Sequence, residues 1–101
     1  MTKDEILNYL KAHKEEFYTR YGIVKIGIFG SYAKGSATKY SDIDIFYERD
    51  KKFILKSGLK FLALSKQIAK DLNVSKVDLV KLSSMNPIVK HYAQKDFIYV
   101  E

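Results

Sequence analysis

Two strand-like runs separated by a short connection constrain this fold more than any other feature. Residues 23–29 (IVKIGIF) are β-branched and aromatic, which predicts a buried strand. Residues 42–47 (DIDIFY) alternate in character with a period of two, which predicts a second strand. The connection has room for one helical turn, closed by Gly35, and for a polar loop over residues 36–41. A β-sheet must therefore lie at the centre of the fold.

Helical patterns flank the two strands. Residues 2–21 carry an apolar stripe at spacings of three, four and seven, start with a capping box at Thr2 and stop at Gly22. Residues 57–73 repeat the pattern, with Leu62 among the residues expected on the apolar face. Both segments are therefore expected to pack as helices against the sheet.

Further strand and helix signals complete the chain. KVDLVKL at residues 76–82 predicts a third strand, and residues 97–100 predict a short last one. Pro87 suits the first turn of a helix that runs to about residue 94. This order predicts an α/β (α+β) fold, a mixed sheet of about four strands with helices packed on it. The length predicts a single domain over residues 1–101.

Composition excludes several kinds of chemistry. The chain has no cysteine, so disulfides, thiolate catalysis and cysteine-based zinc sites are ruled out. The 18 Lys and Arg against 12 Asp and Glu give a net charge of +6. Such a charge favours nucleotide phosphates, RNA or an acidic protein surface as ligand, although a solubilising lysine-rich surface explains it more simply. No run resembles a signal peptide or membrane span, which predicts a cytoplasmic protein that does not bind membranes.

Two carboxylates share one face of the second strand. Asp42 and Asp44 are two residues apart, so their side chains point the same way at a separation of roughly 6–7 Å. Like charges this close disfavour ionisation, and a hard divalent cation such as Mg²⁺ removes the conflict. Asp78 interrupts an otherwise apolar strand, where an acid is costly unless it is paired or bound to metal. If the two strands are neighbours, Asp78 joins the other two acids as a third carboxylate.

Gly30 and Ser31 stand where the first strand ends and the helical turn begins. Backbone N–H groups and the partial positive charge of a helical turn favour an anion at such a junction. Gly30 lets a phosphate approach the backbone, and the Ser31 hydroxyl adds a donor. A lone Gly-Ser is usually a turn and a lone Asp-x-Asp is usually surface, but their combination with a third acid indicates a site for a nucleoside triphosphate and Mg²⁺.

These residues resemble the signature of the polymerase-β-like nucleotidyltransferases, and most closely that of the minimal nucleotidyltransferase (MNT) group. The family pattern is Gly-Ser, ten residues, then Asp-x-Asp, and ten residues separate Ser31 from Asp42. The resemblance implies that AMP is transferred from ATP to a hydroxyl while pyrophosphate leaves. It implies that Asp42, Asp44 and Asp78 hold Mg²⁺, and that Asp78 helps to deprotonate the hydroxyl.

The resemblance also implies the phosphate contacts and a partner. Gly30 and Ser31 would hold the β- and γ-phosphates. Lys34 occupies a position that is often Arg in this signature, which keeps the charge but loses the planar fork. MNT proteins commonly act as antitoxins that adenylylate a HEPN nuclease toxin, so a HEPN protein is the expected partner, in homo- or hetero-oligomers. The alternatives are a non-catalytic antitoxin that only covers its toxin, and a nucleotidyltransferase that acts on RNA or a small molecule.

Other polar and aromatic residues are expected to be ordinary. His13 and His91 each lack a second ligand at metal-binding spacing, so neither is expected to be catalytic. Tyr32 and Tyr40 flank the site and are expected to pack rather than to stack on a base. Lys39 and Arg49 lie near the site in sequence and are expected to be solvated.

Overall fold

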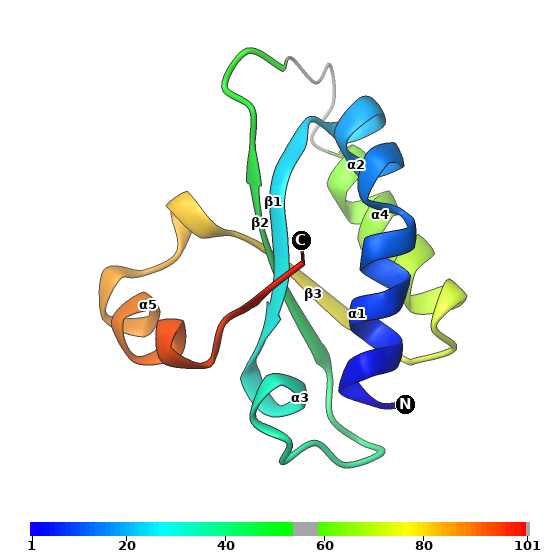
Figure 1. Cartoon of the computed structure of the whole chain (residues 1–101), viewed down its shortest axis with the longest axis vertical. Coiled ribbons are helices and arrows are strands. Elements are labelled where there is room, and N and C mark those ends of the chain that lie inside the picture. The colour runs from blue at the N-terminus through cyan, green and yellow to red at the C-terminus, as the bar shows by residue number, and fades with distance from the viewer. Residues whose placement is uncertain (54–58, 101) are drawn as a thin grey trace.

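The computed structural model describes residues 1–53 and 59–100 (Figure 1). In chain order the elements are α1 (Lys3–Ala12), α2 (Lys14–Tyr21), β1 (Ile23–Phe29), α3 (Gly30–Lys34), β2 (Ile43–Arg49), α4 (Leu59–Asp71), β3 (Val77–Lys81), the 3₁₀ turn η1 (Leu82–Ser84), α5 (Pro87–Ala93), the 3₁₀ turn η2 (Gln94–Asp96) and β4 (Ile98–Tyr99). Each strand and helix expected from the sequence is present among them.

The four strands form one mixed sheet in the order β3-β2-β1-β4. β1 lies antiparallel to both β2 and β4, whereas β2 and β3 run parallel. The parallel pair needs a crossover, and α4 supplies it between β2 and β3. This arrangement confirms the predicted α+β class and the expectation that the strands carrying Asp44 and Asp78 are neighbours.

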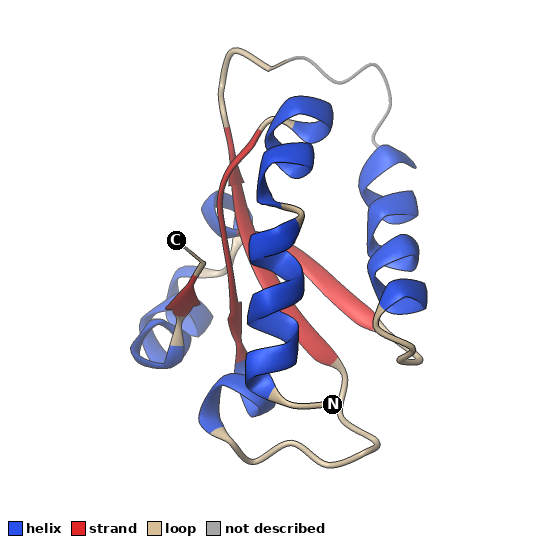
Figure 2. Cartoon of the chain, turned by 45° about the vertical axis from the view of Figure 1, so that its right-hand side comes forward, coloured by secondary structure: helices blue, strands red, loops and turns tan. Residues whose placement is uncertain are grey.

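The hydrophobic core lies between one face of the sheet and the helices α1, α2 and α4, which cover that face (Figures 1 and 2). Alternation along the strands delivers the apolar side chains to this face. The buried core residues are Ile6, Leu10 and Phe17 from α1 and α2, Ile23, Ile26 and Ile28 from β1, Ile43, Ile45 and Tyr47 from β2, Leu64, Ile68 and Leu72 from α4 and its end, Val77 from β3, and Tyr32 from α3. Burial of this layer fixes which strand positions point to the opposite face.

The opposite face carries aromatic packing of its own. Phe46 is fully buried and stacks on Phe97, with ring centroids 4.5 Å apart. Phe29 and Tyr99 meet the same cluster edge-on or tilted. α5 lies on this side of the sheet, away from the three large helices (Figures 1 and 2). The strand positions in step with Phe46, including Asp44, therefore face this second, thinner layer.

Three sequence-based expectations were wrong: the unbroken first helix, the apolar face of α4 and the end of β3. The first helical segment is divided at His13, where φ −102° and ψ 4° depart from helical values. Leu62 is exposed, whereas Leu64, which was left out of the predicted face, is buried. Leu82 begins η1 instead of ending β3, because the chain tightens there to bury its side chain. Ser57, the expected start of the following helix, lies outside the described residues.

None of the helices in residues 1–53 and 59–100 has the length and apolar composition that crossing a membrane requires. The capping box at the start of α1 is present as expected, because Thr2 and Glu5 each accept a hydrogen bond from the other's backbone N–H. Gly22 ends α2 in the left-handed conformation, which its lack of a side chain permits.

Candidate active site

The pairing of β2 with β3 brings the predicted acids together. Asp44 is directly opposite Asp78 in the parallel ladder. Asp42 precedes β2 by one residue and points to the same face as Asp44, because residues two apart on an extended chain share a face. The continuing register sets Asp42 beside Lys76, whose carbonyl accepts the backbone N–H of Ile43. Three carboxylates thus meet at one end of two adjacent strands.

The environment of Asp44 disfavours its charge. Burial is the largest cause that raises the pKa of this carboxyl, and the negative charges of Asp78 and Asp42 raise it further. The Lys76 ammonium opposes these effects by lowering the pKa. The interaction of all three acids in one electrostatic group supports the view that they act on a common ligand. A divalent cation between them would supply the positive charge that Asp44 lacks.

Lys76 is a counter-charge that the sequence reasoning missed. Its Nζ lies 3.8 Å from Asp42 Oδ2 and 3.5 Å from Asp78 Oδ1. Its position two residues before Asp78 was the available signal, because the period of a strand places the two side chains on the same face. The ammonium therefore bridges two of the three carboxylates.

Asp78 is less enclosed than its apolar neighbours in sequence suggested. Its side chain is 41% exposed, because position 78 alternates with the buried Val77 and shares a face with Asp44, away from the helix-covered core. The described residues include no buried polar or charged side chain. Asp78 is therefore partly exposed and paired with Lys76 instead of being a buried acid, and burial of Asp44 remains the largest cause of that residue's raised pKa, ahead of the charges of Asp78 and Asp42.

Gly30 joins the two halves of the site. Its φ is +73°, a left-handed conformation that L side chains rarely adopt. A Cβ placed on Gly30 would collide with the Asp44 carboxylate, and it would lie 3.1 Å from Asp44 Cγ. The sequence reasoning assigned this glycine to phosphate approach. The structure adds a second requirement, because the Asp44 side chain lies against the Gly30 backbone.

α3 begins at Gly30, directly after β1, and ends at Gly35 in the left-handed conformation. Ser31 lies in its first turn, where the backbone N–H groups have no helical partner. Lys34 lies in its last turn, and its Nζ is 3.9 Å from Asp96 Oδ2. This ion pair connects α3 to η2. Asp96 is a second residue that sequence reasoning missed, and its distance along the chain left no local signal.

The carboxylates of Asp42, Asp44 and Asp78 are the donors available to a metal ion at this site. In the part of the chain that the structure describes, no three His, Cys, Asp or Glu side chains are grouped closely enough to enclose an ion. The carboxylate oxygens of Asp42, Asp44 and Asp78 are nevertheless the hard donors that Mg²⁺ prefers. They lie at the same end of two neighbouring strands, and their negative charges repel one another. Mg²⁺ keeps several water or phosphate ligands when bound, so an open edge with few protein donors fits its chemistry.

Several residues near the motif in sequence lie elsewhere in space. Arg49 ends β2 at the far end from Asp44, where it donates to the Phe53 carbonyl and lies over the Phe61 ring. Tyr40 is 82% exposed, and the expectation that it packs is wrong; its ring contacts the Lys39 ammonium, 5.1 Å from the ring centroid.

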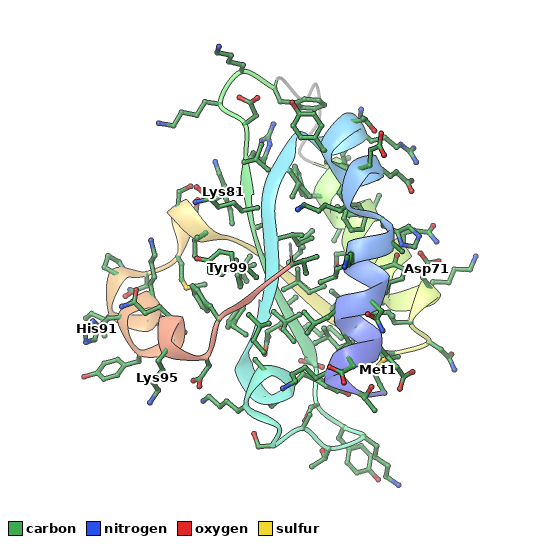
Figure 3. The ribbon with its side chains drawn as sticks, in the orientation of Figure 1. Met1, Asp71, Lys81, His91, Lys95 and Tyr99 are labelled. Atoms are coloured by element: carbon green, nitrogen blue, oxygen red, sulfur yellow. The ribbon has the colours of Figure 1, made fainter. Side chains whose placement is uncertain are left out.

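The two histidines are also placed apart from the acids. His13 packs between the rings of Tyr9 and Phe17, and its Nδ1 donates to the Tyr9 carbonyl. His91 lies on α5, at the outer edge of the molecule (Figure 3).

Known structures share this fold. A toxin–antitoxin complex with AMP-PNP contains a chain that superposes with a TM-score of 0.70 at 22% identity, covering 100% of this chain and 73% of that one. The MNT antitoxin complex with a tri-AMPylated Shewanella oneidensis HEPN toxin gives a TM-score of 0.69 at 19% identity, covering 99% and 72% of the two chains. This chain therefore shares the fold of one chain in each of these two complexes.

Sequence comparison is more specific. Residues 10–100 match the family described as nucleotidyltransferase domain, and the chain belongs to that family. The protein adenylyltransferase MntA of Thermococcus cleftensis is 36% identical over 100 residues, which span 99% of this chain and 97% of the relative. A relative from Methanocaldococcus jannaschii is 41% identical over 100 residues, which span 98% of each chain. The resemblance stated from the motif is confirmed.

Proposed function

We propose that this chain is an Mg²⁺-dependent protein adenylyltransferase that transfers AMP from ATP to a hydroxyl of a HEPN toxin and so acts as its antitoxin. The observation that carries the proposal is the meeting of Asp42, Asp44 and Asp78 beside the Gly30-Ser31 turn. Support comes from the activity named for the Thermococcus relative, which matches this chain over nearly its whole length.

The metal half of the site consists of the three carboxylates. Asp42 and Asp44 would hold Mg²⁺, and Asp78, opposite Asp44, would complete the set. Bound Mg²⁺ would neutralise phosphate charge and relieve the repulsion among the acids. The raised pKa of Asp44 supports this assignment, because the carboxylate is short of positive charge without a cation.

The phosphate half of the site is the β1–α3 junction. The backbone N–H groups at Gly30 and Ser31 would bind the β- and γ-phosphates, and the Lys34 ammonium would add a positive charge at the other end of α3. Because the Asp44 carboxylate lies against Gly30, phosphates bound there would be adjacent to the acids.

The transfer step follows from these positions. The acceptor hydroxyl oxygen attacks the α-phosphorus, the bond from that phosphorus to the bridging oxygen of pyrophosphate breaks, and Asp78 accepts the hydroxyl proton. Asp78 suits this role because its half-exposed side chain can reach an incoming hydroxyl. The nucleophile belongs to the partner, so the chain supplies positioning and charge and no covalent intermediate is needed.

The test uses the chain with labelled ATP, Mg²⁺ and a HEPN-domain protein from the same organism. We expect the HEPN protein to gain AMP mass, and we expect EDTA or the Asp78→Asn substitution to prevent the gain. A tight complex without any transfer would contradict the proposal and favour an antitoxin that acts only by covering its toxin.

A further inference from the structure

α5 is amphipathic in the reverse of the usual sense. Ile88 and Tyr92 are 69% and 68% exposed, and Val89 is 53% exposed. The half-buried positions of the same helix are Lys90 and Ala93. A helix on a globular protein normally turns its apolar stripe toward the core. Here the large apolar side chains point to solvent, so the helix presents a surface suited to a partner.

Local interactions define α5. The Asn86 side chain caps it by accepting from the backbone N–H groups of Ile88 and Val89, and Pro87 occupies its first turn. The helix contains no buried residue. Seven residues with these caps present an ordered apolar surface that the rest of the described chain does not cover.

α5 lies on the sheet face that carries the active-site acids. That face includes Asp44 and Asp78, whereas α1, α2 and α4 cover the opposite one (Figure 1). η2 follows α5 directly and is tied to α3 by the ion pair between Asp96 and Lys34. A molecule seated on α5 would therefore lie next to the edge where the nucleotide is proposed to bind.

The positive charge beside these apolar side chains indicates which kind of protein would bind this surface. α5 contains Lys90 and His91 and no acid, and Lys95 follows in η2. His91 and Lys95 point away from the sheet at the outer edge of the molecule (Figure 3). A twofold contact between two copies would bring the same lysines together, in chains that each carry a net charge of +6. A different protein with an apolar stripe bordered by carboxylates is complementary in both respects.

We propose that the α5 surface, formed by Ile88, Val89 and Tyr92 with Lys95 beside them, is where the acceptor protein docks through an apolar stripe flanked by acidic side chains. This inference rests on the proposed function, because it assigns the surface to the protein that receives AMP. Docking at α5 holds the acceptor on the same side of the sheet as Asp78.

The test compares binding of the full chain and its variants to the same HEPN-domain protein that is used in the transfer assay. Ile88→Ser with Tyr92→Ser should weaken the complex at least about 10-fold, because exposed apolar and aromatic anchors dominate such contacts. Lys95→Glu should weaken it about 3- to 10-fold and flatten its dependence on salt. AMP transfer to the HEPN protein should fall in parallel, whereas AMP-PNP binding should not change.

Tyr18→Ser is the matched control, because Tyr18 is 51% exposed on α2, on the other side of the sheet. It should bind the HEPN protein as the unsubstituted chain does. Unchanged binding by the Ile88 and Tyr92 variant would overturn the proposal, as would failure of the unsubstituted chain to bind. Self-association that this variant abolishes would assign the surface to a second copy instead. Binding that depends on α5 without any transfer would uphold docking and contradict the proposed activity.

Discussion

Gly30 and Gly35 provide a matched pair of substitutions that isolates the contact between the two halves of the site. Both adopt left-handed backbone conformations, with φ of +73° and +79°. A Cβ on Gly30 would collide with the Asp44 carboxylate, whereas a Cβ on Gly35 would meet nothing within 4 Å. Alanine at either position therefore imposes the same backbone strain, and only Gly30→Ala also displaces a proposed metal ligand.

The expected losses of unfolding free energy follow from the backbone strain and from the collision with Asp44. Left-handed backbone costs alanine about 1–2 kcal/mol, and the reduced freedom of the unfolded chain offsets about 0.4–1 kcal/mol of it. Each variant should thus lose about 1 kcal/mol of unfolding free energy, or roughly 4–8 °C in Tm. Gly30→Ala should lose a further ~0.5–1.5 kcal/mol, because the Asp44 side chain must leave its preferred rotamer.

The decisive difference is in activity. Displacing a carboxylate by about 1 Å can cost roughly 100-fold in rate, so AMP transfer by Gly30→Ala should fall by about that factor. Gly35→Ala should keep the transfer rate of the unsubstituted chain. Thermal unfolding in EDTA and transfer assays at a temperature where both variants are folded measure the two effects. Equal losses of transfer activity in the two variants would show that the contact between Gly30 and Asp44 is not what transfer requires.

Two further predictions concern residues around and away from the site. Tyr9→Phe removes the hydrogen bond that the hydroxyl donates to Asp71. That hydrogen bond lowers the pKa of Asp71, so its contribution to the free energy of unfolding is lost as Asp71 is protonated below about pH 4. Burial and the same bond raise the pKa of Tyr9, so the contribution is also lost as the pH rises above about 10. The variant should lose about 0.5–1 kcal/mol near neutrality and show a flatter pH profile in chemical denaturation; an unchanged profile would count against the bond. Lys76→Met removes the ammonium that pairs with Asp42 and Asp78, so Mn²⁺ should bind up to about 5-fold more tightly in titration calorimetry without nucleotide. Weaker Mn²⁺ binding would show that Lys76 does not compete with the metal.

Local signals made much of the fold predictable. β-Branched and aromatic composition identified β1, and period-two alternation identified β2. The Thr2 capping box and Gly22 bounded the first helical segment. Alternation also placed Asp42 and Asp44 on one face of β2, and β3, the strand that carries Asp78, pairs with β2. These features depend on short-range sterics and burial, which the sequence carries directly.

The remaining features depend on tertiary contacts. Nothing local indicates that Gly30 lies against Asp44, because sheet pairing brings them together. The Lys34–Asp96 ion pair joins residues far apart in the chain. The exposure of Asp78 depends on which sheet face the large helices cover, which an apolar run alone does not decide.

We propose that Asp42 and Asp44 hold the metal that supports AMP transfer. The direct measurement is AMP incorporation into the HEPN protein by the Asp42→Asn, Asp44→Asn double variant, with its Tm measured in EDTA. We predict that transfer is abolished and that the metal-free Tm is unchanged or higher, because the substitutions remove the Asp44 carboxylate, whose charge is disfavoured by burial and by the neighbouring acids, together with one of those acids. Undiminished transfer by a folded double variant would contradict the account.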